Sequence, residues 1–249
     1  MSTTLRLRQA ALSAGRDLGR RRVAMALLIG LPLAFYFSTL NSSAGPGKLP
    51  FKVIAGTLGM SWAIGSAAMF LLSGARRVDE RLVLAGYSPW ELLLGRVVLL
   101  LGFAVVLVAV FGTVILTTSD FRQPALLFAA LLAVGVAAIP LGLAIASVVP
   151  GELEGTLVLI AVVGMQMSPN LPAWMPSAGA ITLAETASKG NGAILAPLIT
   201  TALWSSGLLG AAIFWWRRRL PDTQSRALKG SFAEPSLRRD GLSSGVAEA

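Results

Sequence analysis

The chain has 249 residues, of which 55% are hydrophobic and 13% are charged, about half the charged share of a soluble domain. It contains no cysteine and no histidine, which excludes disulfide bonds and thiolate sites and removes the commonest general base and metal ligand. The net charge of +9 does not indicate a nucleic-acid partner, because nearly all charged residues lie outside six long apolar stretches. We expect no metal site and no cofactor in this chain.

Each of these six stretches lacks Asp, Glu, Lys and Arg and is long enough, or nearly so, to cross a bilayer as a helix, since a core of about 30 Å needs roughly 20 apolar residues. They cover residues 23–40, 53–75, 97–117, 125–151, 155–174 and 192–216. The sequence therefore predicts an all-α polytopic membrane protein with six transmembrane helices. We expect an interfacial segment at 1–22, a membrane domain at 23–216 and a basic, disordered cytoplasmic tail at 217–249.

The basic residues indicate how the spans are oriented. Of the 21 Lys and Arg residues, 17 lie in the N-terminal segment, the 76–96 connection and the C-terminal tail, and four lie in the connections of the opposite side. Cytoplasmic segments carry such an excess of positive charge. Both termini are therefore predicted to be cytoplasmic.

Residues 4–22 have the pattern of a helix that lies on the membrane surface. Leu7, Ala11, Ala14 and Leu18 recur at helical spacing, and arginines supply a basic opposite face. A disordered basic tail is the alternative.

The second span, 53–75, carries small residues at helical spacing. Ala55 is followed by Gly59, and Ser61 by Gly65. Such pairs permit the close approach of another helix. The sequence leaves open whether that helix belongs to the same chain or to a second copy.

The connection between the second and third spans contains a short charged helix. Val78, Leu82 and Ala85 recur at helical spacing, and the charges at 79–81 face mostly elsewhere. This pattern predicts an amphipathic helix that ends near Ala85 and is suited to docking on another protein. An ordinary loop is the alternative.

The end of this helix and the start of the third span are both marked by local signals. Gly86 is a favourable C-terminal stop, because glycine adopts positive φ readily. Ser88 can cap a new helix, Pro89 fits its first turn, and Glu91 completes a capping box. We predict a helix break between Gly86 and Ser88.

This arrangement resembles the permease subunits of ABC exporters, the ABC type-2 permease family, from about Leu5 to Arg219. The loop after the second span is similar in having Glu80-Arg81, an apolar stretch, Pro89 and then Gly95-Arg96. The resemblance implies that this loop is a coupling helix that meets a separate ATPase. The residues that it implicates are Asp79, Glu80, Arg81, Gly86, Tyr87 and Pro89, together with Glu152 and Glu154 in the short loop before the fifth span.

The segment 168–192 before the last span is rich in proline. The run Thr182-Leu183-Ala184-Glu185 is a candidate capping box within it. The family resemblance implies a short re-entrant or interfacial helix on the outer side. A simple extracellular loop is the alternative.

A few adaptable or polar side chains lie within the spans. Met and Trp suit an apolar surface that accommodates varied ligands. The candidates for a translocation path are Met60, Trp62, Met165, Gln166 and Met167. Ordinary helix packing is the alternative for all five.

Missing motifs narrow the function. The chain has no G-x-x-x-x-G-K-[ST] phosphate-binding loop, so ATP and Mg²⁺ are expected on a separate ATPase subunit. The spans are expected to contain no buried ionisable residue, which argues against ion-coupled transport. The sequence therefore predicts a permease subunit of an ABC exporter in the bacterial inner membrane that pairs with a second permease subunit, identical or different. A non-transporting scaffold or regulatory protein and a secondary transporter are the alternatives.

Overall fold

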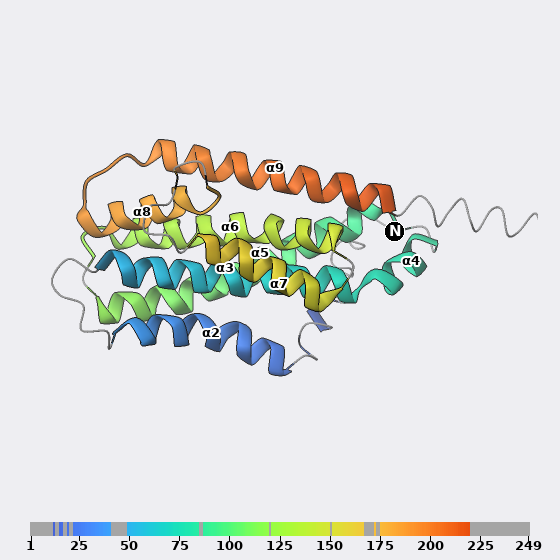
Figure 1. Ribbon diagram of the computed structural model, residues 1–249, viewed down its shortest axis with the longest axis horizontal. Coiled ribbons are helices and arrows are strands. Elements are labelled where there is room, and N and C mark those ends of the chain that lie inside the picture. Colours follow the sequence, from blue (N-terminus) through green and yellow to red (C-terminus); the bar gives the residue numbers. More distant parts are fainter. Residues whose placement is uncertain are drawn as a thin grey trace, which may run out of the picture.

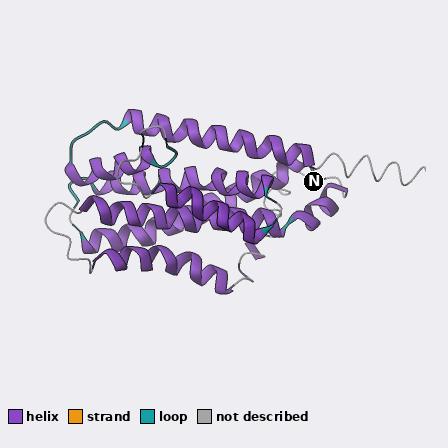
Figure 2. Cartoon of the chain, viewed as in Figure 1, coloured by secondary structure: helices purple, strands orange, loops and turns teal. Residues whose placement is uncertain are grey.

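The computed structural model describes residues 12, 15, 16, 19, 22–40, 49–84, 87–119, 121–149, 151–166, 172 and 175–219. Within these ranges the chain forms helices and no strand (Figure 2). The helices are α2 (Arg22–Leu40), α3 (Leu49–Gly74), α4 (Arg76–Leu84), α5 (Pro89–Thr118), α6 (Pro124–Val148), α7 (Glu152–Met165), α8 (Ala178–Lys189) and α9 (Leu195–Arg219). The predicted all-α class is confirmed for this part. The interfacial helix expected at 4–22 lies almost entirely outside the described residues, as does the tail beyond Arg219.

The long helices lie side by side, with α4 at one end of the molecule and α8 at the other (Figure 1). The α4 end also includes the start of α7 and the end of α9 (Figure 1). The α8 end includes the starts of α6 and α9. α3 and α6 occupy the centre and contain much of the hydrophobic core, whereas α9 covers α6 and α8 and leaves most of its own surface exposed.

Four helices of the described part are long and apolar enough to cross a membrane. Their spans are Ile54–Gly74, Trp90–Thr118, Pro124–Val148 and Leu195–Arg218. The first and fifth predicted spans do not meet this criterion. α2 contributes a shorter apolar stretch, Leu28–Ser38, and α7 has 14 residues, about 21 Å at 1.5 Å per residue.

The fifth predicted span, 155–174, is wrong at its end. α7 stops at Met165, and the next described helix, α8, begins at Ala178. The side chain of Gln166 joins the two helices, because its Oε1 accepts a hydrogen bond of 3.2 Å from the backbone N–H of Ser177. This break faces Ser61 in the middle of α3, so it lies at about half the height of the bundle.

The helix in the segment 168–192 begins earlier than predicted. The hydroxyl of Thr182 donates to the carbonyl of Ala178 within α8, so it does not cap a helix start. The apolar residues from Ala178 onward are buried against α3, α6 and α9, which extends the helix by one turn. Gly190, at φ 76°, ends α8 in the left-handed conformation, which glycine adopts readily.

Glycines permit the closest helix contacts in the core. A Cβ on Gly142 of α6 would lie 2.1 Å from the carbonyl oxygen of Gly65 in α3, and a Cβ on Gly59 would lie 2.8 Å from Cα of Pro32 in α2. The small residues of the second span are thus used for packing within the chain. This decides between the two alternatives that the sequence left open.

Candidate functional site

The charged connection between α3 and α5 folds as predicted along the backbone. α4 ends at Leu84, and the N–H of Tyr87 donates to the carbonyl of Leu82 over 3.0 Å, the six-to-one bond of a Schellman motif. α5 begins at Pro89, and Glu91 Oε2 accepts a hydrogen bond of 3.2 Å from the backbone N–H of Ser88. Local capping chemistry therefore sets the break. The predicted stop at Gly86 lies outside the described residues.

The predicted apolar stripe of α4 is confirmed at Leu82, which is half-buried against the hydrophobic core, and is wrong at Val78. Ala85 lies outside the described residues. Val78, which the spacing assigns to the buried side, is 49% exposed, whereas Asp79 is only 1% exposed. Val83 is buried one turn after Asp79. The helix is rotated in this way because the carboxylate of Asp79 has a partner inside the bundle.

That partner is Arg96 of α5. Nη2 of Arg96 donates to Oδ1 of Asp79, and the two side chains form a buried ion pair. The guanidinium carbon also lies 5.6 Å from the centroid of a Trp216 ring in α9, within the range of a cation–π contact. Since Arg96 lies inside the candidate span Trp90–Thr118, the expectation of no buried ionisable residue in the spans is wrong.

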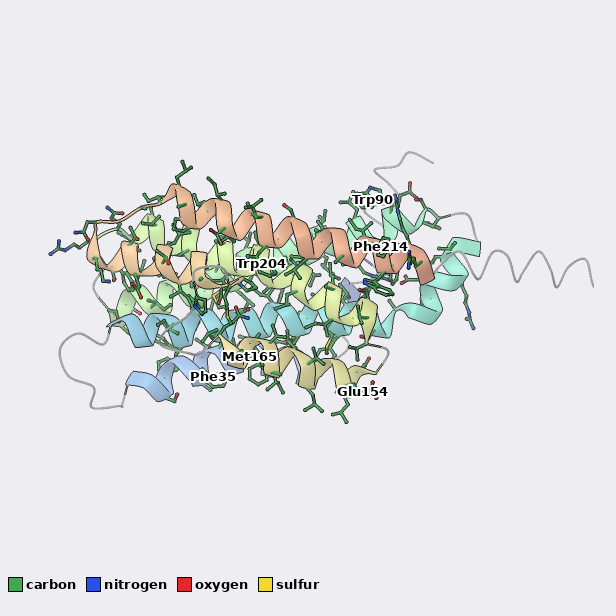
Figure 3. All side chains as sticks on the ribbon, turned by 45° about the horizontal axis from the view of Figure 1, so that its top comes forward. Phe35, Trp90, Glu154, Met165, Trp204 and Phe214 are labelled. Carbon is green, nitrogen blue, oxygen red and sulfur yellow. The ribbon has the colours of Figure 1, made fainter. Side chains whose placement is uncertain are left out.

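The outer surface of the α4 end carries charged and aromatic side chains. Arg81 of α4 is exposed, as are Glu152 and Glu154 in the first turn of α7. Figure 3 shows Glu154 on one side of this end and Trp90 and Phe214 on the other. Carboxylates in a first helical turn interact favourably with the helix dipole, and both glutamates are accessible to a partner.

The other predicted coupling residues divide into two groups. Tyr87 is half-buried and packs against the hydrophobic core. The side chains of Glu80 and Pro89 lie outside the described residues. The structure therefore brings Arg81, Glu152 and Glu154 to the surface of the same end, and it places Asp79 inside.

The structure describes four of the five candidate path residues, and their side chains lie in different surroundings. Met60 is fully buried, Met165 is 68% exposed, and Trp62 is half-buried with its ring 6.0 Å from that of Phe35. Gln166 is buried and donates from Nε2 to the carbonyl of Val162. Met167 lies outside the described residues.

Gln166 and Ser61 do line one small cavity, together with Ser177 and α6. Its volume is about 10 Å³, at the lower limit for a single water molecule. Because the amide of Gln166 bonds to both α7 and the start of α8, its evident role in this conformation is to hold the break between them.

A comparison with protein families finds a match between residues 4–168 and the model described as ABC-2 type transporter. The chain belongs to the ABC-2 type transporter family. The match supports the resemblance predicted from the charged connection, and it makes this part of the chain a transmembrane permease domain without a catalytic role of its own. A comparison with curated proteins finds no match.

Sequence reasoning missed the pairing of Asp79 with Arg96 in this ABC-2 domain. The signal is weak but present: Arg96 lies four residues after Leu92 and four before Leu100, and both leucines are buried. A charge on the buried stripe of a helix requires a partner. Asp79 is an acidic residue close by in the sequence that could supply one.

Proposed function

We propose that the chain is a membrane subunit of an ATP-driven ABC exporter, which forms its path with a second permease subunit and receives motion from separate ATPase subunits at the α4 end. The observation that carries this proposal is α4 itself, a nine-residue helix at the end of the bundle with Val78 and Arg81 exposed. ATP and Mg²⁺ would be held by the partner ATPase. This chain would bind neither.

The charge distribution supports a cytoplasmic α4 end. Among the described side chains, Arg81, Arg96, Arg217 and Arg218 lie at this end. The α8 end carries Arg122 and Lys189. Because cytoplasmic connections carry the excess of Lys and Arg, the α4 end faces the cytoplasm in this proposal, and both termini lie in the cytoplasm of the bacterial cell.

The broken fifth span supports a re-entrant arrangement. α7 and α8 have 14 and 12 residues, which correspond to about 21 and 18 Å. α7 would rise from the cytoplasmic side to the middle of the membrane, and α8 would occupy the outer half. Broken helices at membrane depth occur where neighbouring helices enclose them, as α3, α6 and α9 enclose α8 here.

Exposed apolar faces support a path between two subunits. α5, α7 and α9 present such faces, with exposed residues such as Val105, Leu157 and Leu203. A path lined by such faces would suit a hydrophobic or amphiphilic substrate.

The proposal is tested by purifying the tagged chain from its native membrane in mild detergent and identifying the proteins that accompany it. We expect a stoichiometric subunit with a G-x-x-x-x-G-K-[ST] motif. Glu80→Ala combined with Arg81→Ala should remove this subunit, while the matched pair Glu185→Ala and Lys189→Ala at the α8 end should retain it.

Two results would contradict the proposal. If no ATPase accompanies the chain under conditions that keep a known ABC complex intact, a scaffold or regulatory role replaces transport. If the variants at 80–81 and at 185–189 retain the ATPase equally, the docking surface is not on α4.

A further inference from the structure

The consecutive helices α4 and α5 meet the distant helix α9 at the α4 end through three buried side chains. Asp79 of α4, Arg96 of α5 and Trp216 of α9 are 1%, 5% and 6% exposed. Arg96 contacts both of the others, through the ion pair with Asp79 and through the stacked ring of Trp216. We call this set the α4 joint.

The α4 joint supplies a large part of the buried attachment of α4. Among the described side chains of α4, only Asp79 and Val83 are buried, and the backbone of α4 touches only α3 and α5 closely. Leu82 is half-buried against the hydrophobic core, and the ion pair of Asp79 adds a directional contact. Arg96 suits this role because its planar guanidinium fork bonds in a fixed orientation.

Trp216 extends the joint to the last helix. α9 packs mainly against α6 and α8, and in the last three turns of α9 only Ala212 and Trp216 are buried. The indole ring of Trp216 therefore provides the contact of α9 with the guanidinium that holds α4.

The composition of the joint is not the most stable one for a buried position. Well-packed apolar side chains are often as stable as a buried ion pair or more so. In addition, Nη1 of Arg96 and Nε1 of Trp216 are buried without a hydrogen-bond acceptor among the described residues. A buried donor without an acceptor lowers stability. A role other than stability is therefore the better explanation of these side chains.

We propose that Asp79, Arg96 and Trp216 are positioning residues that make α4, the start of α5 and the end of α9 move as one body. A displacement of α4 then reaches α9, to which α4 has no direct chain connection. This proposal rests on the proposed function in one respect: an ATPase docked on α4 would be the cause of the displacement. The joint itself is a property of this chain.

The link between α4 and α5 is tested by cysteine labelling, because the chain contains no cysteine of its own. Val83→Cys reports on the buried side of α4, and Val78→Cys is the exposed control. The protein is placed in nanodiscs of phosphatidylethanolamine and phosphatidylglycerol and treated with a maleimide. Asp79→Asn and Arg96→Gln should each raise the labelling rate at position 83 about tenfold and leave position 78 unchanged, since labelling of a buried thiol follows local opening.

The double variant identifies the pair as one unit. Asp79→Asn together with Arg96→Gln should label position 83 about as fast as the faster single variant, because either change alone already breaks the Asp79–Arg96 ion pair. Unchanged labelling in the single variants, or two independent effects that multiply in the double variant, would overturn the link between α4 and α5.

The link to α9 is tested by measuring the distance between spin labels on Val78→Cys and Ala211→Cys. Trp216→Leu should broaden the distance distribution, whereas Trp216→Phe, which retains an aromatic face, should keep it narrow. Trp215→Leu is the matched control, because Trp215 is 42% exposed. If Trp216 contributes packing alone, Trp216→Leu lowers the melting temperature and leaves the distribution unchanged, which overturns the link to α9.

These experiments separate the joint from the proposed function. Neither the labelling nor the distance measurement requires an ATPase. A loose α4 in the variants, in a chain that binds no ATPase, would support the joint and contradict the docking assignment. An ATPase that binds to α4, with labelling and distances unchanged by every variant, would contradict the joint alone.

Discussion

The two short helices at opposite ends of the bundle are attached by different forces. Eight of the twelve residues of α8 are buried, and most of these are apolar or small. α4 buries Asp79 and Val83 among its described side chains, and Asp79 pairs with Arg96. The comparison teaches that α8 is a packed part of the membrane core, whereas α4 is joined to the core by a directional polar contact.

The two ion pairs of the described residues repeat this contrast. The Asp79–Arg96 pair is buried, with side chains 1% and 6% exposed. The Glu185–Lys189 pair on α8 has an N···O distance of 3.2 Å and side chains 34% and 59% exposed. Water and salt screen the second pair, so it contributes little to the attachment of α8.

The largest effect is expected when the buried pair is broken. Arg96→Met removes the guanidinium that pairs with the buried carboxylate of Asp79, which should lower the free energy of unfolding by about 3–5 kcal/mol. The exposed Arg218, whose guanidinium carbon lies 4.3 Å from the Phe214 ring centroid, is the control. Arg218→Met should cost about 1 kcal/mol or less. Unfolding by SDS in mixed micelles measures the free energy of both variants. Equal decreases would contradict the larger contribution of the buried pair.

A smaller effect is expected from one methyl group between α8 and α9. A Cβ on Gly179 would lie 2.4 Å from the carbonyl oxygen of Pro197, so Gly179→Ala should destabilise by about 1–3 kcal/mol. Gly207 on the exposed face of α9 has no heavy atom within 4 Å of such a Cβ. Gly207→Ala should instead stabilise by up to about 1 kcal/mol. The same unfolding assay should give opposite signs, and a loss of similar size at both positions would refute the close packing of α8.

Gln166 tests the break between α7 and α8. Gln166→Leu removes the acceptor of the Ser177 N–H, which should destabilise by about 1–2 kcal/mol. Met165→Leu, at a neighbouring position that is 68% exposed, should change stability by less than about 0.5 kcal/mol. Thermal unfolding in nanodiscs compares the two variants. Equal melting temperatures would show that the amide does not hold the break.

The smallest effect is expected at the exposed pair on α8. Glu185→Gln should lower the free energy of unfolding by about 0.5 kcal/mol or less, with a further decrease in the effect at high salt. Comparing it with Asp79→Asn in one SDS titration sharpens the contrast between the two ends. A loss at Glu185 as large as that at Asp79 would remove the distinction.

The sequence predicted the features that depend on neighbouring residues. The break between α4 and α5 follows from Ser88 and Glu91. The four long apolar spans follow from composition alone, because a bilayer requires apolar helices of that length.

The features that the sequence did not predict depend on contacts between different helices. The predicted span ran on to 174 because this segment carries no charge, but the helix stops where Gln166 bonds to Ser177. From its place in the pattern of α4, Asp79 was expected to face water. Only the packing of α5 beside α4 shows that Asp79 is buried and paired with Arg96. Thr182 and Glu185 have the spacing of a capping box, but packing of Ala178 onward begins the helix earlier.

Photo-crosslinking from single positions in native membranes tests the central claim, that the α4 end docks an ATPase, most directly. Benzoylphenylalanine is placed at Arg81 on α4, at Glu152 on α7 and at Lys189 on α8 as the control from the opposite end, and mass spectrometry identifies each adduct. We predict an ATPase with a phosphate-binding loop in the adducts of positions 81 and 152 and none at position 189. An ATPase adduct at position 189, or its absence from positions 81 and 152 while it accompanies the purified chain, would contradict the account.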